Sequence, residues 1–176
     1  RRQHRLLAAQ LDAFERLRGH PAHVAERQSV APGETPLNLR VEGRPLEIKA
    51  SFKPGTASAF GLKVHTGANG EETVVGYEPA SGEVYIDRTK SGNASFNASF
   101  AARHSAPLPL REGKLRLRVV VDRSSVTVFA GDNEVVLTDQ VFPSAGSDGV
   151  ALFAEGGHAR LEQLKVWPLK SIWARR

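Results

Sequence analysis

The hydrophobic positions of this chain follow two different periods. Near the N-terminus, apolar residues recur at steps of three or four: Leu7, Leu11, Phe14 and Leu17. This spacing predicts an amphipathic helix over residues 1–18. Glycine and proline then become frequent, which predicts a linker over residues 19–36. We expect the linker to hold the helix away from the rest of the chain. An exposed apolar stripe of this kind favours a helix-mediated homodimer.

After the linker the period changes to two. Apolar and polar residues alternate in short segments, of which the clearest are 46–52, 60–64, 115–121, 126–128, 135–137, 150–154 and 164–167. Such alternation, broken by turn residues, predicts about nine or ten antiparallel strands in two packed sheets. The predicted fold is therefore all-β, an antiparallel two-sheet β-sandwich of the jelly-roll or concanavalin-like kind. We expect the sandwich to span residues 37–173, with a basic tail at 174–176.

Composition and charge exclude several classes of protein. The net charge of +5 comes from the two ends, since residues 1–5 hold three Arg and residues 170–176 hold Lys170, Arg175 and Arg176. Without these six, 18 basic residues face 19 acidic ones. A nucleic-acid partner, which needs a clustered basic surface, is not expected. No apolar run approaches the ~18 residues of a membrane span, so no membrane partner is expected. The chain does not begin with Met and is expected to be a piece of a longer protein.

Catalytic motifs are missing from the sequence. A hydrolytic enzyme needs a nucleophile and an acid, or two carboxylates, fixed in one cleft, and no motif here indicates such a set. The sequence has no nucleophile elbow and no phosphate-binding loop. His20 and His23 lie close together but lack a third ligand, and the absence of Cys removes thiolate sites. No catalytic residue, metal site or cofactor is therefore predicted for this chain alone.

Two polar clusters, at 85–92 and 121–126, each contain an Asp-Arg pair. In one interpretation they are turns, in which Asp caps the backbone and Arg88 pairs with Glu78 or Glu83. In the other they bind sugar, because carboxylates and guanidinium groups suit vicinal hydroxyls. The candidate carbohydrate-binding residues are Asp87, Arg88, Asp122, Arg123, Tyr77, Tyr85 and Glu78. We expect Asp87 and Arg88 to share one shallow pocket, with the two tyrosines stacking on the sugar ring.

These clusters belong to a wider pattern. The segments FGLKV at 60–64, DRTKSG at 87–92, VDRSSVTVF at 121–129, DQVFP at 139–143 and LKSIW at 169–173 occur in this order. The set resembles the C-terminal domain of glycoside hydrolase family 32, which comprises invertases, levanases, inulinases and fructan exohydrolases. The resemblance implies a catalytic five-bladed β-propeller that lies N-terminal to the sandwich. This chain lacks the catalytic motifs of that propeller. The predicted helix, ending at Leu17-Arg18, resembles the family's inter-domain linker, and Thr127 stands where the family usually has Glu.

The resemblance leaves three interpretations of function. In the first, the chain is the non-catalytic C-terminal sandwich of a secreted, extracellular β-fructosidase; it stabilises the propeller and contacts fructan. In the second, it is an independent levan- or fructan-binding module that grips a terminal fructose, as some relatives of this sandwich do. In the third, it is a folded fragment without a ligand. The apolar stripe of the helix favours the first, because a free module needs no such stripe.

Overall fold

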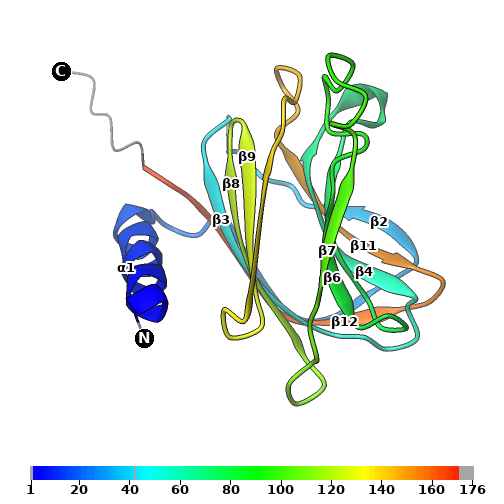
Figure 1. Ribbon diagram of the computed structural model, residues 1–176. Helices are drawn as coiled ribbons and strands as arrows, with labels where there is room; N and C mark the ends of the chain where they lie inside the picture. Colours follow the sequence, from blue (N-terminus) through cyan, green and yellow to red (C-terminus); the bar gives the residue numbers. More distant parts are fainter. Residues whose placement is uncertain (1, 42, 171–176) are drawn as a thin grey trace.

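Two six-stranded sheets pack face to face, with one helix against the outer side of the first sheet (Figure 1). The computed structural model describes residues 2–41 and 43–170. The first sheet contains, in spatial order, β1 (His23–Val30), β12 (Ala159–Pro168), β3 (Leu46–Lys53), β8 (Leu115–Asp122), β9 (Ser125–Ala130) and β10 (Val135–Gln140). The second contains β2 (Gly33–Pro36), β11 (Gly149–Glu155), β4 (Ala59–Thr66), β5 (Thr73–Glu78), β6 (Glu83–Asp87) and β7 (Arg103–Pro107). The helix is α1 (Arg2–Leu17), and a 3-10 turn, η1 (Ala68–Gly70), follows β4.

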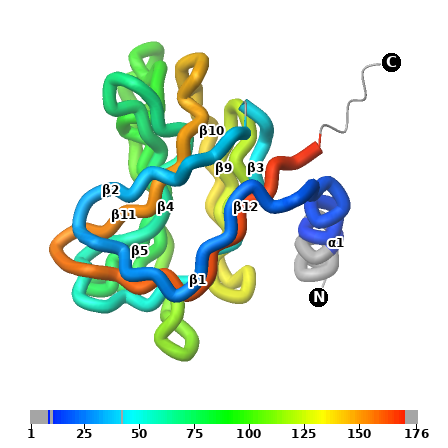
Figure 2. Tube along the Cα trace, turned by 180° about the vertical axis from the view of Figure 1, so that it is seen from behind, coloured from blue at the N-terminus to red at the C-terminus, as the bar shows by residue number. Residues whose placement is uncertain are grey.

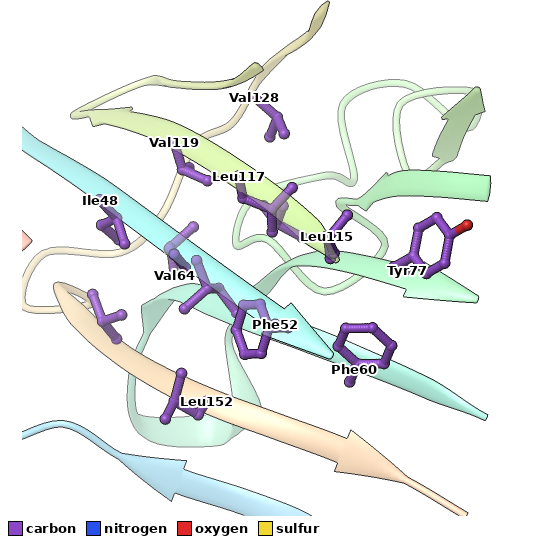
Figure 3. Close-up of a cluster of buried hydrophobic side chains, with 14 of the residues drawn as sticks. Ile48, Phe52, Phe60, Val64, Tyr77, Leu115, Leu117, Val119, Val128 and Leu152 are labelled. Carbon is purple, nitrogen blue, oxygen red and sulfur yellow. The ribbon is translucent and has the colours of Figure 1, made fainter. Parts of the chain in front are cut away.

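The predicted all-β antiparallel sandwich is confirmed. In β3 and β4 the alternating apolar residues point into the space between the sheets, where Phe52 and Phe60 lie with their ring centroids 5.6 Å apart. Ile48 and Val64 are completely buried beside them (Figure 3). Leu62 is completely buried in the same core cluster. Two facing apolar surfaces thus form one continuous core, as the period of two requires.

Residues 19–36 are not a linker, and this prediction is wrong. Residues 23–30 form β1, which pairs with β12 along the edge of the first sheet (Figure 2), and residues 33–36 form β2 on the edge of the second. An edge strand is held mainly by backbone hydrogen bonds, so it needs few apolar side chains; in β1 only Val30 is buried. Arg27, with a φ of 49°, further interrupts the alternation that would have revealed the strand.

The prediction that α1 stands away from the sandwich is also wrong. Leu11, Phe14 and Leu17 pack against Val120, Phe129 and Leu169 on the outer face of the first sheet. In Figure 1 the helix lies beside β3 and β8. The chain passes directly from α1 into the sheet, because Ala22 N donates to Val166 O at 2.7 Å. The described part of the stripe is therefore covered by its own chain, which removes the basis for a helix-mediated homodimer.

A buried ionic cluster fixes the end of α1 to the sheet. The carboxylate of Glu47 in β3 is completely buried and accepts hydrogen bonds from Arg18 Nε at 2.7 Å and Arg18 Nη2 at 2.8 Å. Arg118 of β8 forms an ion pair with the same carboxylate and donates from Nη2 to Leu11 O at 2.9 Å. Burial alone would raise the pKa of Glu47, but the Arg18 hydrogen bonds and the two positive charges outweigh it and lower that pKa.

Removing residues 1–18 is therefore expected to destabilise the sandwich. The deletion exposes Val120 and Phe129 and leaves Glu47 with Arg118 as its single guanidinium partner. A loss of about 3 kcal/mol corresponds to a melting temperature about 6–12 °C lower for a chain of this length. Differential scanning calorimetry of the truncated and full chains checks this. A melting temperature within about 1 °C of the full chain would show that α1 does not stabilise the sandwich.

Three sequence predictions lie outside the described residues. These are the side chain of Leu7, the Ile172-Trp173 end of the LKSIW segment and the basic tail at 174–176. Within the described residues, no helix is long and apolar enough to cross a membrane.

Candidate functional site

A polar hollow of about 270 Å³ opens on the outer face of the second sheet. In β6 the residues Val84 and Ile86 point into the core, so their neighbours Tyr85 and Asp87 point to the opposite face. We call the space above them the sheet hollow. Its charged and aromatic lining comes from β4, β5, β6, β7, β11 and the loops beside them: Lys63, Glu72, Glu78, Tyr85, Asp87, Lys90, Arg103 and Glu155.

The floor of the sheet hollow is the Tyr85 ring lying over glycine. Gly61, Gly76 and Tyr85 are consecutive partners across β4, β5 and β6. A Cβ atom added at Gly76 would lie 2.4 Å from Cζ of the Tyr85 ring. Only glycine at this position lets the ring lie against the sheet. Burial raises the pKa of the Tyr85 phenol, although the nearby positive charge of Arg103 opposes the rise.

Arg103 covers the other side of the Tyr85 ring. Its guanidinium carbon lies 3.6 Å from the ring centroid, and its Nη2 forms an ion pair with Glu78 Oε1 at 2.9 Å. This stacking and pairing hold the planar guanidinium in one orientation. The prediction that Tyr85 stacks on a sugar ring is wrong, because Arg103 occupies that face; a ligand would meet Arg103 instead.

Asp87 takes the turn role proposed from the sequence and keeps one carboxylate oxygen without a partner among the described residues. Its Oδ1 accepts hydrogen bonds from Thr89 N at 2.9 Å and Thr89 Oγ1 at 2.7 Å, which closes a turn. Its Oδ2 has no polar contact with a residue of the described ranges, and the same holds for the carboxylate of Glu155. These two side chains are therefore available as acceptors in the sheet hollow.

Lys63 adds a fixed positive charge to the sheet hollow. It pairs with Glu72 at 2.8 Å and with Glu34 of β2. Burial would lower the pKa of Lys63, but the hydrogen bonds to Glu34 and Glu72 outweigh it and raise that pKa. The sheet hollow thus presents ammonium and guanidinium donors beside carboxylate acceptors. Such a mixture suits a neutral polyol, whose hydroxyls both donate and accept.

Arg88 lies apart from the sheet hollow. Its guanidinium carbon is 4.0 Å from the Phe100 ring centroid, and its Nη1 donates to Gln140 O at 3.0 Å. Consecutive residues of a strand point to opposite faces, and the turn after Asp87 does not reverse this. The sequence predicted one pocket shared by Asp87 and Arg88. This prediction is wrong, because the two side chains lie on opposite faces. Arg88 pairs with neither Glu78 nor Glu83 within the described residues.

Tyr77 is a core residue rather than a sugar platform. Its ring points between the sheets, next to Phe60 in Figure 3, with ring centroids 6.0 Å apart. Its hydroxyl donates to Leu108 O at 2.8 Å. The predicted stacking of Tyr77 on a sugar is wrong, because the side chain is 3% exposed.

Asp122 and Arg123 line a different hollow, of about 400 Å³, at one end of the sandwich. We call it the end hollow; its polar lining includes the imidazole of His65 and four charged residues, Arg44, Asp122, Arg123 and Asp148. The structure therefore separates the two Asp-Arg clusters. Thr127 lies in neither hollow; its hydroxyl accepts from Thr138 Oγ1 at 3.2 Å on the outer face of the first sheet.

Sequence reasoning missed Lys63, Arg103 and Glu155. Lys63 carried a usable signal, because it alternates with Leu62 and Val64 and so had to face outward. Arg103 carried none, since β7 is a largely exposed edge strand without an apolar pattern. Within the described residues, no group of three or more acidic or histidine side chains is arranged to hold a metal ion.

Comparison with known proteins agrees with this architecture. A family model described as glycosyl hydrolases family 32 C terminal matches residues 13–168. A levanase of Bacillus subtilis is 40% identical over 148 residues, which cover 82% of this chain and 22% of that protein. An extracellular exo-inulinase of Aspergillus ficuum is 36% identical over 157 residues, which cover 88% of this chain and 29% of that protein. The chain thus spans less than a third of either relative.

Solved structures give the same result. The crystal structure of exo-inulinase from Aspergillus awamori superimposes with a TM-score of 0.84 at 33% identity, covering 92% of this chain and 32% of the other. Fructan 1-exohydrolase IIa from Cichorium intybus, at 13% identity and a TM-score of 0.76, shares the fold; the match covers 91% of this chain and 37% of the other. The chain belongs to glycoside hydrolase family 32, as a C-terminal domain of that family of fructosidases.

Proposed function

We propose that this domain is a non-catalytic module that contacts fructan through the sheet hollow, within an extracellular fructan- or sucrose-hydrolysing enzyme. The observation that carries the proposal is the arrangement of Arg103, held on Tyr85 and Glu78, beside the free oxygen of Asp87. A guanidinium and a carboxylate side by side form donor and acceptor contacts to vicinal hydroxyls. The relatives' names, levanase and exo-inulinase, identify fructans as the polymers those proteins act on.

The catalytic β-propeller of the parent enzyme is the proposed protein partner. The relatives are several times longer than this chain, and this chain matches the C-terminal part of the family. The helix α1 would connect that partner to the sandwich. The hydrogen bonds from Arg18 to Glu47 fix the end of this helix to the first sheet. A fixed exit direction would stabilise one relative placement of the two domains. The name of the Aspergillus relative, an extracellular enzyme, supports the proposal of secretion.

An independent fructan-binding module is the second candidate function. The apolar stripe of α1 had argued against it, but Leu11, Phe14 and Leu17 are covered by the chain's own sheet. The domain therefore shows no unpaired helix face among the described residues that would need a partner. Binding of fructan by the isolated chain would support this candidate.

Replacing Asp87 by asparagine tests the sheet hollow. Asn keeps an oxygen for the Thr89 turn but turns the free acceptor into a donor. We expect fructan affinity, measured by isothermal titration calorimetry, to fall at least about tenfold while stability changes by less than about 0.5 kcal/mol. Asp132→Asn, at an exposed turn outside both hollows, is the matched control. Unchanged affinity in Asp87→Asn would rule out the sheet hollow as the binding site.

A further inference from the structure

The end hollow is built by segments that are far apart in the sequence. It lies between Arg44 just before β3, the end of β4, the turn from β8 to β9, and the loop at 143–148. In Figure 1 the turn between β8 and β9 and the yellow-orange loop that leads into β11 reach the same end of the sandwich. Its floor is apolar and is formed by Leu46, Val121 and Val150, each nearly fully buried.

The walls of the end hollow are braced in place. The Glu71 carboxylate accepts hydrogen bonds from Ser144 N at 2.9 Å, from Ser144 Oγ at 2.6 Å and from Ser147 Oγ. The ring of His65, itself buried, bridges two walls, with Nδ1 3.1 Å from Ser147 O and Nε2 2.9 Å from Asp122 O. The backbone of the walls is therefore fixed before a ligand arrives and needs no ordering on binding.

Four exposed charged side chains surround the opening. Asp122 Oδ1 is held by Arg123 N at 2.7 Å, and Asp148 Oδ2 by Gly43 N at 3.2 Å. The second oxygen of each carboxylate, and the guanidinium groups of Arg44 and Arg123, have no polar contact with any residue in the ranges 2–41 and 43–170. Two acceptors and two forked donors without a partner among the described residues thus line the same opening.

The balance of charge selects the class of ligand. Two guanidinium groups and two carboxylates sum to zero, so the four groups together favour a neutral polyol over an anion. The apolar floor suits the C–H face of a sugar ring. The volume of about 400 Å³ lies in the range of small-ligand sites.

We propose that the end hollow is a second sugar-binding site, so that the domain holds fructan at two separate places. The choice of fructan as the ligand rests on the proposed function. The existence of the site rests on the braced walls, the apolar floor and the charged groups of the end hollow. The two hollows meet at one loop: Glu71 braces the end hollow and its neighbour Glu72 lines the sheet hollow. When one polymer chain is bound at the first hollow, its binding at the second becomes an intramolecular step. The overall affinity for the polymer then exceeds the affinity of either hollow alone.

Amide chemical shifts of the ¹⁵N-labelled chain, titrated with fructose, test the proposal. We expect two groups of shifted amides, one at residues 85–90 and 103, the other at 43–44, 122–124 and 144–148. The double substitution Arg44→Ala and Arg123→Ala removes two donors that brace nothing else in the described structure. It should abolish the second group of shifts, leave the first, and lower retention on levan at least about tenfold. Arg16→Ala, exposed on α1, is the control and should change neither.

The outcomes separate this proposal from the function proposed above. Shifts at 85–90 and 103 without any at the end hollow overturn the second site and leave the sheet hollow supported. Shifts confined to the end hollow overturn the sheet hollow and support the second site. Absence of both overturns both. End-hollow amides that respond to inorganic phosphate but not to fructose identify an anion site and overturn the proposal.

Discussion

Replacing Glu47 by alanine is expected to lower the free energy of unfolding by about 3–5 kcal/mol. The substitution leaves the guanidinium groups of Arg18 and Arg118 largely buried without their shared carboxylate, and it also releases the end of α1. Urea unfolding monitored by tryptophan fluorescence measures the effect, because Trp167 lies against Arg18, with the guanidinium carbon 4.3 Å from its ring centroid. Glu15→Ala is the matched control, since Glu15 pairs with the same Arg18 at an exposed position. It should cost no more than about 1 kcal/mol.

The pH dependence of the Glu47 contribution has a defined sign. The folded-state pKa of Glu47 lies below its ordinary value of 4.5, so the unfolded chain takes up a proton first as the pH falls. The stabilisation is complete above 4.5 and is lost as the pH falls through the depressed folded-state pKa. The stability difference between wild type and Glu47→Gln should therefore shrink in acid. A difference that grows on acidification would contradict the charge assignment.

Replacing Gly76 by alanine is expected to destroy the sheet hollow. The new Cβ would lie 2.4 Å from the Tyr85 ring, so the ring must leave the sheet and displace Arg103 from its stacked position. Overpacking of this kind costs about 1–3 kcal/mol of stability. Fructan affinity should fall at least about tenfold, because a misplaced Arg103 no longer donates beside Asp87.

The displaced ring can be observed directly. The protein has two tyrosines, so the ring signals of Tyr85 in the proton NMR spectrum need to be distinguished only from those of Tyr77. Gly19→Ala is the matched control. A Cβ atom added at Gly19 would lie 3.9 Å from its nearest neighbour, Pro168 O, and so meets no clash. It should leave the ring signals and affinity unchanged. A Gly76→Ala protein that binds fructan normally would show that Tyr85 and Arg103 do not form the site.

The central strands of the fold could be predicted because the sheets bury one face of each strand. The alternation in β3, β4 and β8 follows directly from that burial. β1 and β2 escaped because an edge strand depends on backbone pairing, which leaves little trace in side-chain polarity. The stripe of α1 was seen, but its partner was not: Val120 and Phe129 lie on the outer face, where an alternating pattern predicts polar residues.

The candidate site was predicted only in part, for a related reason. Asp87 and Glu78, two of the candidate residues, line the sheet hollow, whereas Arg88 and Tyr77 follow the strand alternation to other faces. Arg103 takes the place that Arg88 was expected to fill, and it comes from β7, the next strand along the chain, where it lies opposite Asp87. Sequence proximity of Asp and Arg therefore predicted an Asp-Arg pair on this sheet but the wrong arginine.

The most direct test is retention of the purified chain on insoluble levan, with inulin and cellulose as parallel polymers and reducing-sugar release measured in the same tubes. The account predicts that the chain is depleted from solution by levan or inulin and not by cellulose. Asp87→Asn should reduce this depletion, and no sugar should be released above the buffer level. Equal retention on cellulose, no retention on either fructan, or sugar release that persists through repurification would contradict a non-catalytic fructan-binding domain.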